Sequence, residues 1–198
     1  MTCGVILAAG ESRRMGSPKA LLDYQGETFL DRLIGLFARR CSPVIAVLGA
    51  QQGTVRAALL RAGQALLVEN PDFRLGQLSS MQCGLRAVPA DADGVLFTLV
   101  DHPAVASATI DALVDPAPGC GGQALLRIPT YGGRHGHPIW ISSSLIPEFL
   151  ALPAASSAKA VVRAHQRETS YIGVDDPGIL ADVDDPAAYS SLLARSGA

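Results

Sequence analysis

Short, continuous apolar runs alternate along the first half of the chain with longer segments whose apolar residues recur at helical spacing. The runs are typical of strands buried on both faces of a sheet, and the periodic segments are typical of amphipathic helices. The apolar runs predict strands at residues 4–9, 43–49, 65–68 and 94–100. The periodic segments predict helices at residues 27–40, 52–62 and 78–88, the first capped by Thr28.

The second half is less regular, and residues 20–24 predict only a brief extended piece. Residues 116–122 predict a loop, residues 124–129 and 137–142 predict strands, and residues 145–152, 158–165 and 186–195 predict helices. Strands that alternate with helices predict right-handed crossovers. We therefore expect an α/β fold with three Rossmann-like layers: a mainly parallel sheet with helices on both faces.

Three positions mark one edge of this sheet, because each lies just after the end of a predicted strand: Gly10, Asn70 and Asp101. In open α/β sheets, ligands bind outside the carboxyl ends of the strands. We expect these three residues to share the edge that carries the functional site.

Length and composition limit the classes of function. A chain of 198 residues, 48% hydrophobic and 17% charged, predicts a single globular domain over residues 1–198 and excludes a disordered chain. A net charge of −2 argues against a nucleic-acid surface, so we expect small-molecule partners. No apolar run is long enough to span a bilayer, no signal-peptide pattern precedes residue 4, and no C-x-x-C pair is present. These features predict a cytoplasmic protein with reduced thiols and no membrane partner.

The loop after the first strand has the chemistry of a phosphate site. Beyond Gly10 it holds Arg13, Arg14, Gly16 and Lys19. Glycines let backbone N–H groups approach an anion closely, and the cations neutralise its charge. The spacing excludes Walker A, because five residues rather than four separate the two glycines, and the dinucleotide fingerprint G-x-G-x-x-G is absent.

Carboxylates at two places are candidate metal ligands. Asp101 comes directly after the most continuous apolar strand, six residues too early to cap the next helix. Mg²⁺ favours one or two such carboxylates together with phosphate oxygens. Asp182 and Asp184 would lie on one face of an extended segment, whereas Asp185 before Pro186 is a helix cap. The residues alone leave open whether the acids at 182–185 bind metal or form a solvated turn.

Two further segments carry polar side chains suited to binding. Residues 75–80 could read a base edge or could simply begin a helix, and the residues alone do not decide between these interpretations. In residues 131–138, His135 and His137 lie two apart without a third ligand, which is poor spacing for zinc. We interpret His137, with Arg134, as donors to an anionic acceptor, and His102 as a residue that orients the same region.

The glycine loop resembles the signature of the nucleotidyltransferases. The matching residues are Leu7, Ala8, Ala9, Gly10, Arg14, Met15, Pro18 and Lys19. Within that superfamily the chain looks most like the molybdenum cofactor nucleotidyltransferases, with further matching blocks at residues 69–85, 95–103, 131–138 and 182–186. The resemblance therefore extends over nearly the whole chain.

This resemblance implies a Mg²⁺-dependent transfer of CMP from CTP to the terminal phosphate of molybdopterin, with release of pyrophosphate. It implies catalytic roles for Arg14, Lys19 and Asp101, a metal site at Asp101 and Asp184, and acceptor binding by His102, Arg134 and His137. The nucleotide-binding residues that it implies are Leu7, Ala8, Ala9, Gly10, Arg13, Lys19, Gln77, Ser79 and Ser80. Only Arg14 aligns with the motif arginine, so the resemblance leaves open which of Arg13 and Arg14 contacts phosphate.

Cytosine as the base is implied by the Ala8-Ala9 form of the loop, because guanylyl-transferring relatives tend to carry Gly-Gly there. Two alternatives remain. One keeps the fold but uses GTP as the donor, or a sugar or polyol phosphate as the acceptor. The other is a non-catalytic protein that binds molybdenum cofactor and assists an enzyme of the xanthine dehydrogenase type. The partners implied are CTP, molybdopterin and a transient contact with a molybdoenzyme.

Overall fold

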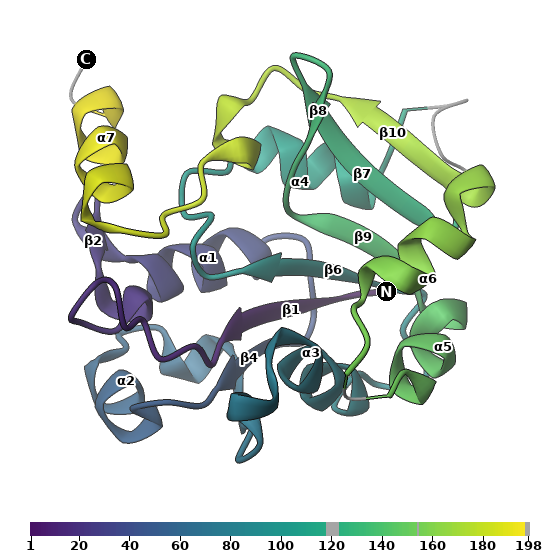
Figure 1. Ribbon diagram of the computed structural model, residues 1–198. Coiled ribbons are helices and arrows are strands. Elements are labelled where there is room, and N and C mark those ends of the chain that lie inside the picture. Colours follow the sequence, from purple (N-terminus) through teal and green to yellow (C-terminus); the bar gives the residue numbers. More distant parts are fainter. Residues whose placement is uncertain (118–122, 154, 197–198) are drawn as a thin grey trace.

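The fold is built on one sheet that runs through the middle of the molecule (Figure 1). The structure is a computed structural model that describes residues 1–117, 123–153 and 155–196. The sheet order is β10-β7-β9-β6-β1-β4-β5, and β8 pairs with β7. Its strands are β1 (Thr2–Ala8), β4 (Val44–Leu48), β5 (Leu66–Glu69), β6 (Gly94–Leu99), β7 (Leu126–Tyr131), β8 (Arg134–His135), β9 (Ile139–Ser142) and β10 (Thr169–Gly173).

Within this sheet, four of the seven strand pairs that the structure describes are parallel. β1 pairs in parallel with both β4 and β6, and β4 pairs in parallel with β5. β9 runs antiparallel to its neighbours β6 and β7, while β10 lies parallel to β7. The prediction of a mainly parallel sheet is therefore confirmed, and one antiparallel strand joins its two parallel parts.

Helices cover both faces of this sheet, as the sequence predicts. The helices are α1 (Phe29–Phe37), α2 (Gln52–Ala58), α3 (Gln77–Arg86), α4 (Ser107–Val114), α5 (Ile146–Ala151), α6 (Lys159–Ala164) and α7 (Pro186–Ser196). Side chains alternate along each strand, so Ile6 of β1 packs with α1 and α4 residues, whereas Val5 packs with α3 and α5 residues. Two apolar cores result, one on each face, as expected for a three-layer α/β fold.

Several predicted boundaries need correction. The helix predicted at residues 27–40 begins only at Phe29, because Glu27–Thr28 (β3) pairs with Asp23–Tyr24 (β2) across a tight turn. Thr28 caps the helix as predicted, since its side chain accepts a hydrogen bond from the Asp31 N–H. Residues 20–24 are only partly extended, because Lys19–Leu21 forms a 3₁₀ turn.

The helix predicted at residues 52–62 ends at Ala58. Leu59 is extended, and the Arg61 N–H donates to the buried carboxylate of Asp31 at 2.7 Å. This bond takes the chain out of helical geometry before residue 62. Strand β10 was not predicted, because residues 169–173 mix polar and apolar positions. Of the loop predicted at residues 116–122, residues 118–122 lie outside the described residues.

Two further expectations concern membranes and cysteines. Among the described residues, no helix combines the length and the apolar character needed to cross a membrane. Cys3, Cys41 and Cys83 are free thiols, and Cys120 lies outside the described residues.

Candidate functional site

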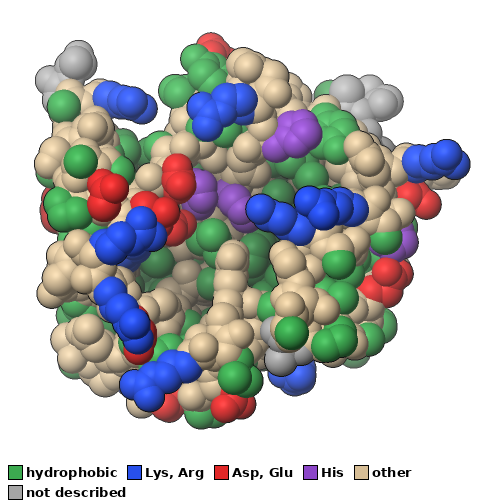
Figure 2. All heavy atoms as spheres, viewed as in Figure 1, with side chains coloured by type: hydrophobic (Ala, Val, Ile, Leu, Met, Phe, Trp, Pro, Cys, Tyr) green, Lys and Arg blue, Asp and Glu red, His purple; other side chains and the backbone are tan. Residues whose placement is uncertain are grey.

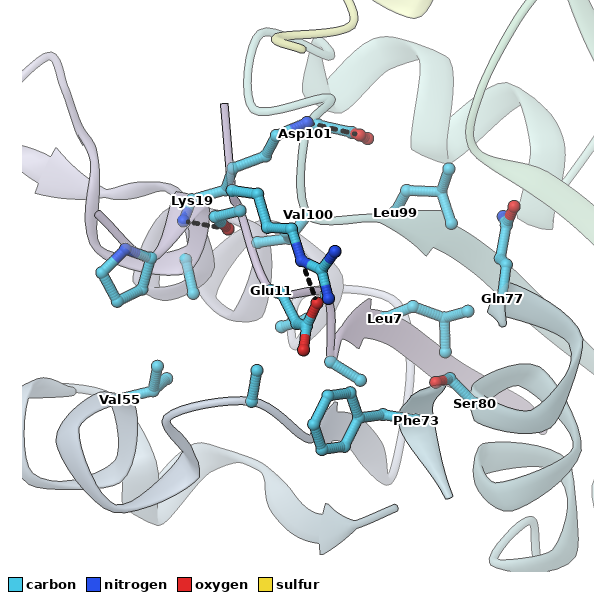
Figure 3. Close-up of a pocket in the computed structure, with 18 of the residues that line it drawn as sticks. Leu7, Glu11, Lys19, Val55, Phe73, Gln77, Ser80, Leu99, Val100 and Asp101 are labelled. Atoms are coloured by element: carbon cyan, nitrogen blue, oxygen red, sulfur yellow. Dashed lines mark hydrogen bonds and ion pairs between the residues drawn. The ribbon is translucent and has the colours of Figure 1, made fainter. Parts of the chain in front are cut away.

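A cavity of about 470 Å³ opens at the carboxyl ends of β1 and β6. The parallel pairing of β1, β4, β5 and β6 brings the residues that follow these strands to one edge, which confirms the expected grouping of Gly10, Asn70 and Asp101. The cavity is lined by the glycine loop, the start of α3 and Asp101 (Figure 3), and also by the second carboxylate, Asp184. The site is thus built from segments far apart in the sequence.

The glycine loop is held open by its own backbone turn. The Met15 N–H donates to the Ser12 carbonyl at 2.9 Å, and the Lys19 N–H donates to the Ser12 hydroxyl at 2.9 Å. Ser12 and Gly16 both have positive φ, at 52° and 70°. A Cβ on Gly10 would meet no atom within 4 Å, so the loop backbone there borders open space that a ligand can approach.

The two loop arginines point to different partners. Arg13 is 2.5 Å from Glu11, which also pairs with Arg74 at 3.4 Å. The Arg13 guanidinium lowers the pKa of the Glu11 carboxyl. Arg14 instead lies 3.5 Å from Asp184. Of the two arginines, Arg14 is therefore the one that faces the candidate metal-binding carboxylates.

Lys19 lies between those carboxylates. Its Nζ donates to Asp184 Oδ1 at 2.7 Å and to Asp101 Oδ2 at 3.4 Å. Lys19 and Asp101 are largely buried, with side-chain exposures of 14% and 18%, so solvent screens their interaction only partly. The hydrogen bond from Lys19 lowers the pKa of Asp184, to which Arg14 adds. The Asp184 carboxylate is thus held in its negatively charged form.

These two carboxylates suit a hard divalent cation. The buried Oδ1 of Asp101 has no hydrogen-bond partner, which leaves a lone pair available for a metal ion. The described residues contain no group of three or more His, Cys, Asp or Glu side chains that could hold a metal ion by itself. The two carboxylates of Asp101 and Asp184 fit Mg²⁺ or Mn²⁺, because these ions bind one or two carboxylates and complete their coordination shell with phosphate oxygens and water.

The start of α3 is organised by a residue whose role the sequence analysis missed. Asn70 is 4% exposed, and its Nδ2 donates to the hydroxyls of Ser79 and Ser80 at 3.0 Å each. Its Oδ1 accepts from the Asp72 N–H at 3.0 Å. Asn70 thereby fixes the turn after β5 to the first turn of α3. Its position directly after a strand was the available signal.

The floor of the cavity is formed by Phe73, which the sequence analysis also missed (Figure 3). A Cβ on Gly49 would lie 2.6 Å from the Ala9 carbonyl oxygen and 2.8 Å from Phe73 Cβ. Only glycine at position 49 allows Ala9 and Phe73 to approach the backbone this closely. Ala8 and Ala9 also line the cavity, and both residues are nearly fully buried.

A second cavity, of about 630 Å³, adjoins the first. Gly76 and Gln77 line both cavities, so the start of α3 is the partition between them. The second cavity is largely apolar, with Phe97, Phe149 and other side chains from β6, α3, α5 and α6, and it also contains His135 and His137. Figure 2 shows carboxylates and histidines side by side in the central hollow, with Lys and Arg side chains on either side.

A pair of histidines connects the two cavities. The rings of His102 and His137 have centroids 4.9 Å apart, and His102 Nε2 is 3.7 Å from Asp101 Oδ1. Burial lowers the pKa of His102. Burial, with a smaller contribution from His102, lowers the pKa of His137 to about 4. His137 is therefore neutral at neutral pH, and the buried Nδ1 atoms of both rings have no hydrogen-bond partner.

Most of the predicted site residues line one of the two cavities. In the first they are Leu7, Ala8, Ala9, Gly10, Arg13, Arg14, Lys19, Gln77, Ser80, Asp101 and Asp184, and in the second His137. Three predicted residues line neither: Ser79, His102 and Arg134. The Ser79 hydroxyl donates to backbone carbonyls of the Asp72–Gly76 turn, His102 is buried behind Asp101, and Arg134 lies exposed on the β7–β8 hairpin.

Relatives of known name match nearly the whole chain. A probable molybdenum cofactor guanylyltransferase from Mycobacterium ulcerans (strain Agy99) is 33% identical over 187 residues, covering 93% of this chain and 89% of that protein. The molybdenum cofactor cytidylyltransferase of Escherichia coli (strain K12) is 25% identical over 191 residues, covering 96% and 95% of the two chains.

Among solved structures, Rv0371c from Mycobacterium tuberculosis H37Rv is similar with a TM-score of 0.81 at 30% identity, covering 98% of each chain. Its complex with manganese is similar with a TM-score of 0.77 at 28% identity and the same coverage. The sequence profile of the MobA-like NTP transferase domain matches residues 4–169, which include the glycine loop, Asp101 and His137. The chain therefore belongs to the MobA-like NTP transferase family, a family of nucleotidyltransferases.

Proposed function

We propose that this protein transfers CMP from CTP to the terminal phosphate of molybdopterin and releases pyrophosphate. The observation that carries the proposal is the contact of Lys19 with both Asp101 and Asp184 beneath a cationic glycine loop, at the mouth of a nucleotide-sized cavity. A cation between two carboxylates, next to backbone N–H groups that can cradle an anion, suits the triphosphate of a nucleotide.

The donor occupies the first cavity, with its triphosphate along residues 10–19 and its base toward Phe73 and the start of α3. Ala8 and Ala9 line this cavity, and this Ala-Ala form of the loop is the reason for proposing cytosine as the base. Lys19 and Arg14 offset the negative charge that builds up on the transferring and leaving groups.

Asp101 and Asp184 hold Mg²⁺ in the proposed site. When bound, the ion neutralises phosphate charge and orients the phosphate oxygens. That the similar protein Rv0371c has been solved as a complex with manganese supports a divalent metal in this protein.

The acceptor occupies the second cavity, and its terminal phosphate reaches past Gln77 toward the first. An oxygen of this phosphate attacks the α-phosphorus of CTP. A new P–O bond forms, the bond to the β-phosphate breaks, and pyrophosphate leaves with the electron pair. The attacking phosphate is already anionic, so no protein nucleophile is needed, and the chain contributes positioning and electrostatic stabilisation. The neutral His137 adds no charge to the acceptor cavity.

A second candidate keeps this chemistry and replaces CTP by GTP. It is supported by the 33% identity to a protein named as a probable guanylyltransferase, compared with 25% to the cytidylyltransferase.

The deciding experiment measures pyrophosphate release with Mg²⁺ and molybdenum cofactor under anaerobic conditions, with CTP, GTP, ATP and UTP compared. We expect release with CTP alone. Release with GTP alone would keep the mechanism and overturn the base assignment. Binding of the cofactor without release from any nucleotide would overturn the catalytic proposal in favour of a cofactor-binding accessory protein.

A further inference from the structure

Residues 176–184 connect three parts of the site, and Asp184 is the one residue of this segment that itself lines one of the two cavities. In Figure 1 this segment leaves β10, passes α4 and leads to α7. It begins with Asp176 and the 3₁₀ turn Pro177–Leu180. The Val183 N–H then donates to the Asp101 carbonyl at 2.9 Å, so the segment reaches the backbone of one candidate metal ligand just before it supplies the other.

Asp176 anchors the start of this segment. The residue is 6% exposed, and its carboxylate accepts three hydrogen bonds. Oδ2 accepts from the Ala106 N–H at 2.8 Å and from the Thr109 hydroxyl at 2.6 Å, and Oδ1 accepts from the Gly178 N–H at 2.8 Å. Ala106 is the N-cap of α4, and its side chain has no atom that can accept a hydrogen bond. The Asp176 carboxylate, from a segment distant in the sequence, instead supplies the acceptor at the start of this helix.

Close packing leaves this anchor no room to shift. A Cβ on Gly178 would lie 2.3 Å from the Ala104 carbonyl oxygen, and a Cβ on Gly136 would lie 2.3 Å from the Ile179 carbonyl oxygen. The His137 N–H also donates to the Ile179 carbonyl at 3.0 Å. The segment is thus in backbone contact with the turn that follows Asp101 and with the residue that enters the second cavity.

We propose that Asp176 is a positioning residue that sets the separation of Asp184 from Asp101, and through it the affinity of the site for a divalent metal. The inference rests on the proposed metal site. Asp176 fixes the 176–184 segment to α4, and Val183 fixes its other end to the Asp101 carbonyl. Asp184 is the next residue and is half exposed, and its carboxylate contacts the flexible side chains of Lys19 and Arg14, so the backbone of the 176–184 segment sets where it lies.

The test substitutes Asp176→Asn in the full-length chain. The amide keeps the shape of the side chain but replaces one acceptor oxygen by a donor, which faces the Gly178 N–H or the Ala106 N–H. Mn²⁺ binding is titrated with and without CTP, from the electron paramagnetic resonance signal of free Mn²⁺. We expect Mn²⁺ to bind about 10-fold more weakly in the variant, the usual loss for a residue that orients a ligand.

Pyrophosphate release provides the second readout. In the Asp176→Asn variant the Mn²⁺ concentration that gives half-maximal release should rise about 10-fold, and saturating Mn²⁺ should restore turnover. Loss of thermal stability with unchanged Mn²⁺ binding would overturn the inference and leave Asp176 a structural residue only. If Asp176→Asn does not fold, Thr109→Val removes one of the three donors without changing the side-chain volume, and it should weaken Mn²⁺ binding in the same direction.

Asp31→Asn is the matched control. Asp31 is also buried, at 2% exposure, and its carboxylate accepts from the Arg61 N–H and the Thr28 hydroxyl. This variant should lose stability and keep the wild-type affinity for Mn²⁺. A wild-type protein that binds no Mn²⁺ in either condition would overturn the metal site itself. A wild-type protein that binds Mn²⁺ and a variant that binds it equally well would overturn only the role of Asp176.

Discussion

At the scale of single residues, the site contains charged groups in contact with one another and one buried carboxylate oxygen that lacks a partner. One ammonium group, on Lys19, contacts two carboxylates, and the buried Oδ1 of Asp101 has no hydrogen-bond partner. A buried acceptor without a partner carries a desolvation penalty of about 1 to 3 kcal/mol. A metal ion at Asp101 would remove that penalty.

The first prediction concerns turnover. Lys19→Ala and Asp101→Ala should each reduce pyrophosphate release at least ~100-fold, because each removes an electrostatic stabiliser of the transferring phosphate. Asp93→Ala is the control. Asp93 lies beside the other end of β6, where it pairs with the N-terminal amine of Met1, so its loss should leave the rate unchanged. Near-normal turnover in either site variant would contradict the assignment.

The second prediction concerns the affinity for a metal ion, which should increase when Lys19 is replaced. Without nucleotide, the Lys19 ammonium occupies the space between Asp101 and Asp184 and offsets their charge. Lys19→Met should therefore bind Mn²⁺ more tightly than the wild type, by at least about 10-fold, although it transfers nucleotide more slowly. Calorimetric titration with Mn²⁺ alone measures this effect. Weaker binding by the Met variant would show that Lys19 does not compete with the metal ion.

At the scale of elements, the two cavities depend on how the ends of strands are joined to the helices that follow. The turn between β5 and α3 is held by the Asn70 side chain, whose three hydrogen bonds reach Asp72, Ser79 and Ser80. The same helix holds α5 through a second buried amide, because Gln82 Nε2 donates to the carbonyls of Phe149 and Leu152. One face of α3 therefore serves the first cavity and another serves the second.

The third prediction uses this pair of amides. Asn70→Ala and Gln82→Ala should each lower the free energy of unfolding by about 1 to 3 kcal/mol, because each leaves buried polar groups without a partner. Only Asn70→Ala should raise the KM for the nucleotide, since only its turn lines the first cavity. Equal KM values in the two variants would mean that the turn does not shape the nucleotide site.

At the scale of the whole molecule, the sequence predicts the nucleotide half of the fold well. Continuous apolar strands such as residues 94–99 are buried on both faces, and their parallel order follows from the helices between them. The grouping of Gly10, Asn70 and Asp101 at one edge could therefore be predicted. Asp184 could be placed only by resemblance, because acids in a connecting segment have no periodic pattern that locates them.

Other parts of the fold and the site could not be predicted from the sequence, for physical reasons. β10 is a mixed polar and apolar strand at the edge of the sheet, and half-exposed edge strands lack the continuous apolar signal. The contacts of Asp176 join residues about 70 positions apart, and no local pattern encodes such a contact. The nucleotide-binding role of Ser79 was implied by the resemblance alone, and no local pattern showed that its hydroxyl donates to the Asp72 and Gly76 carbonyls.

The fourth prediction concerns stability in acid. His137 has its pKa lowered from 6.5 to about 4 by burial, so the unfolded chain binds more protons than the folded one between these values. Stability should therefore be complete above pH 6.5 and fall as the pH drops toward 4. At pH 5 the wild type should have lost about 2 kcal/mol through this residue. Urea unfolding of the wild type and His137→Gln at pH 7 and pH 5 tests this, and equal losses in the two proteins would contradict it.

Asp101 divides the chain into two stretches that contribute mainly to different cavities. Residues before Asp101 build nearly all of the first cavity, and much of the second comes from residues after it. Under the proposed function, the donor and the acceptor are therefore bound largely by two different, contiguous segments of the chain. Exchanging the downstream part between homologues could give a new acceptor to an existing nucleotide site, provided that residues 176–184 travel with it and still fit against the turn after Asp101.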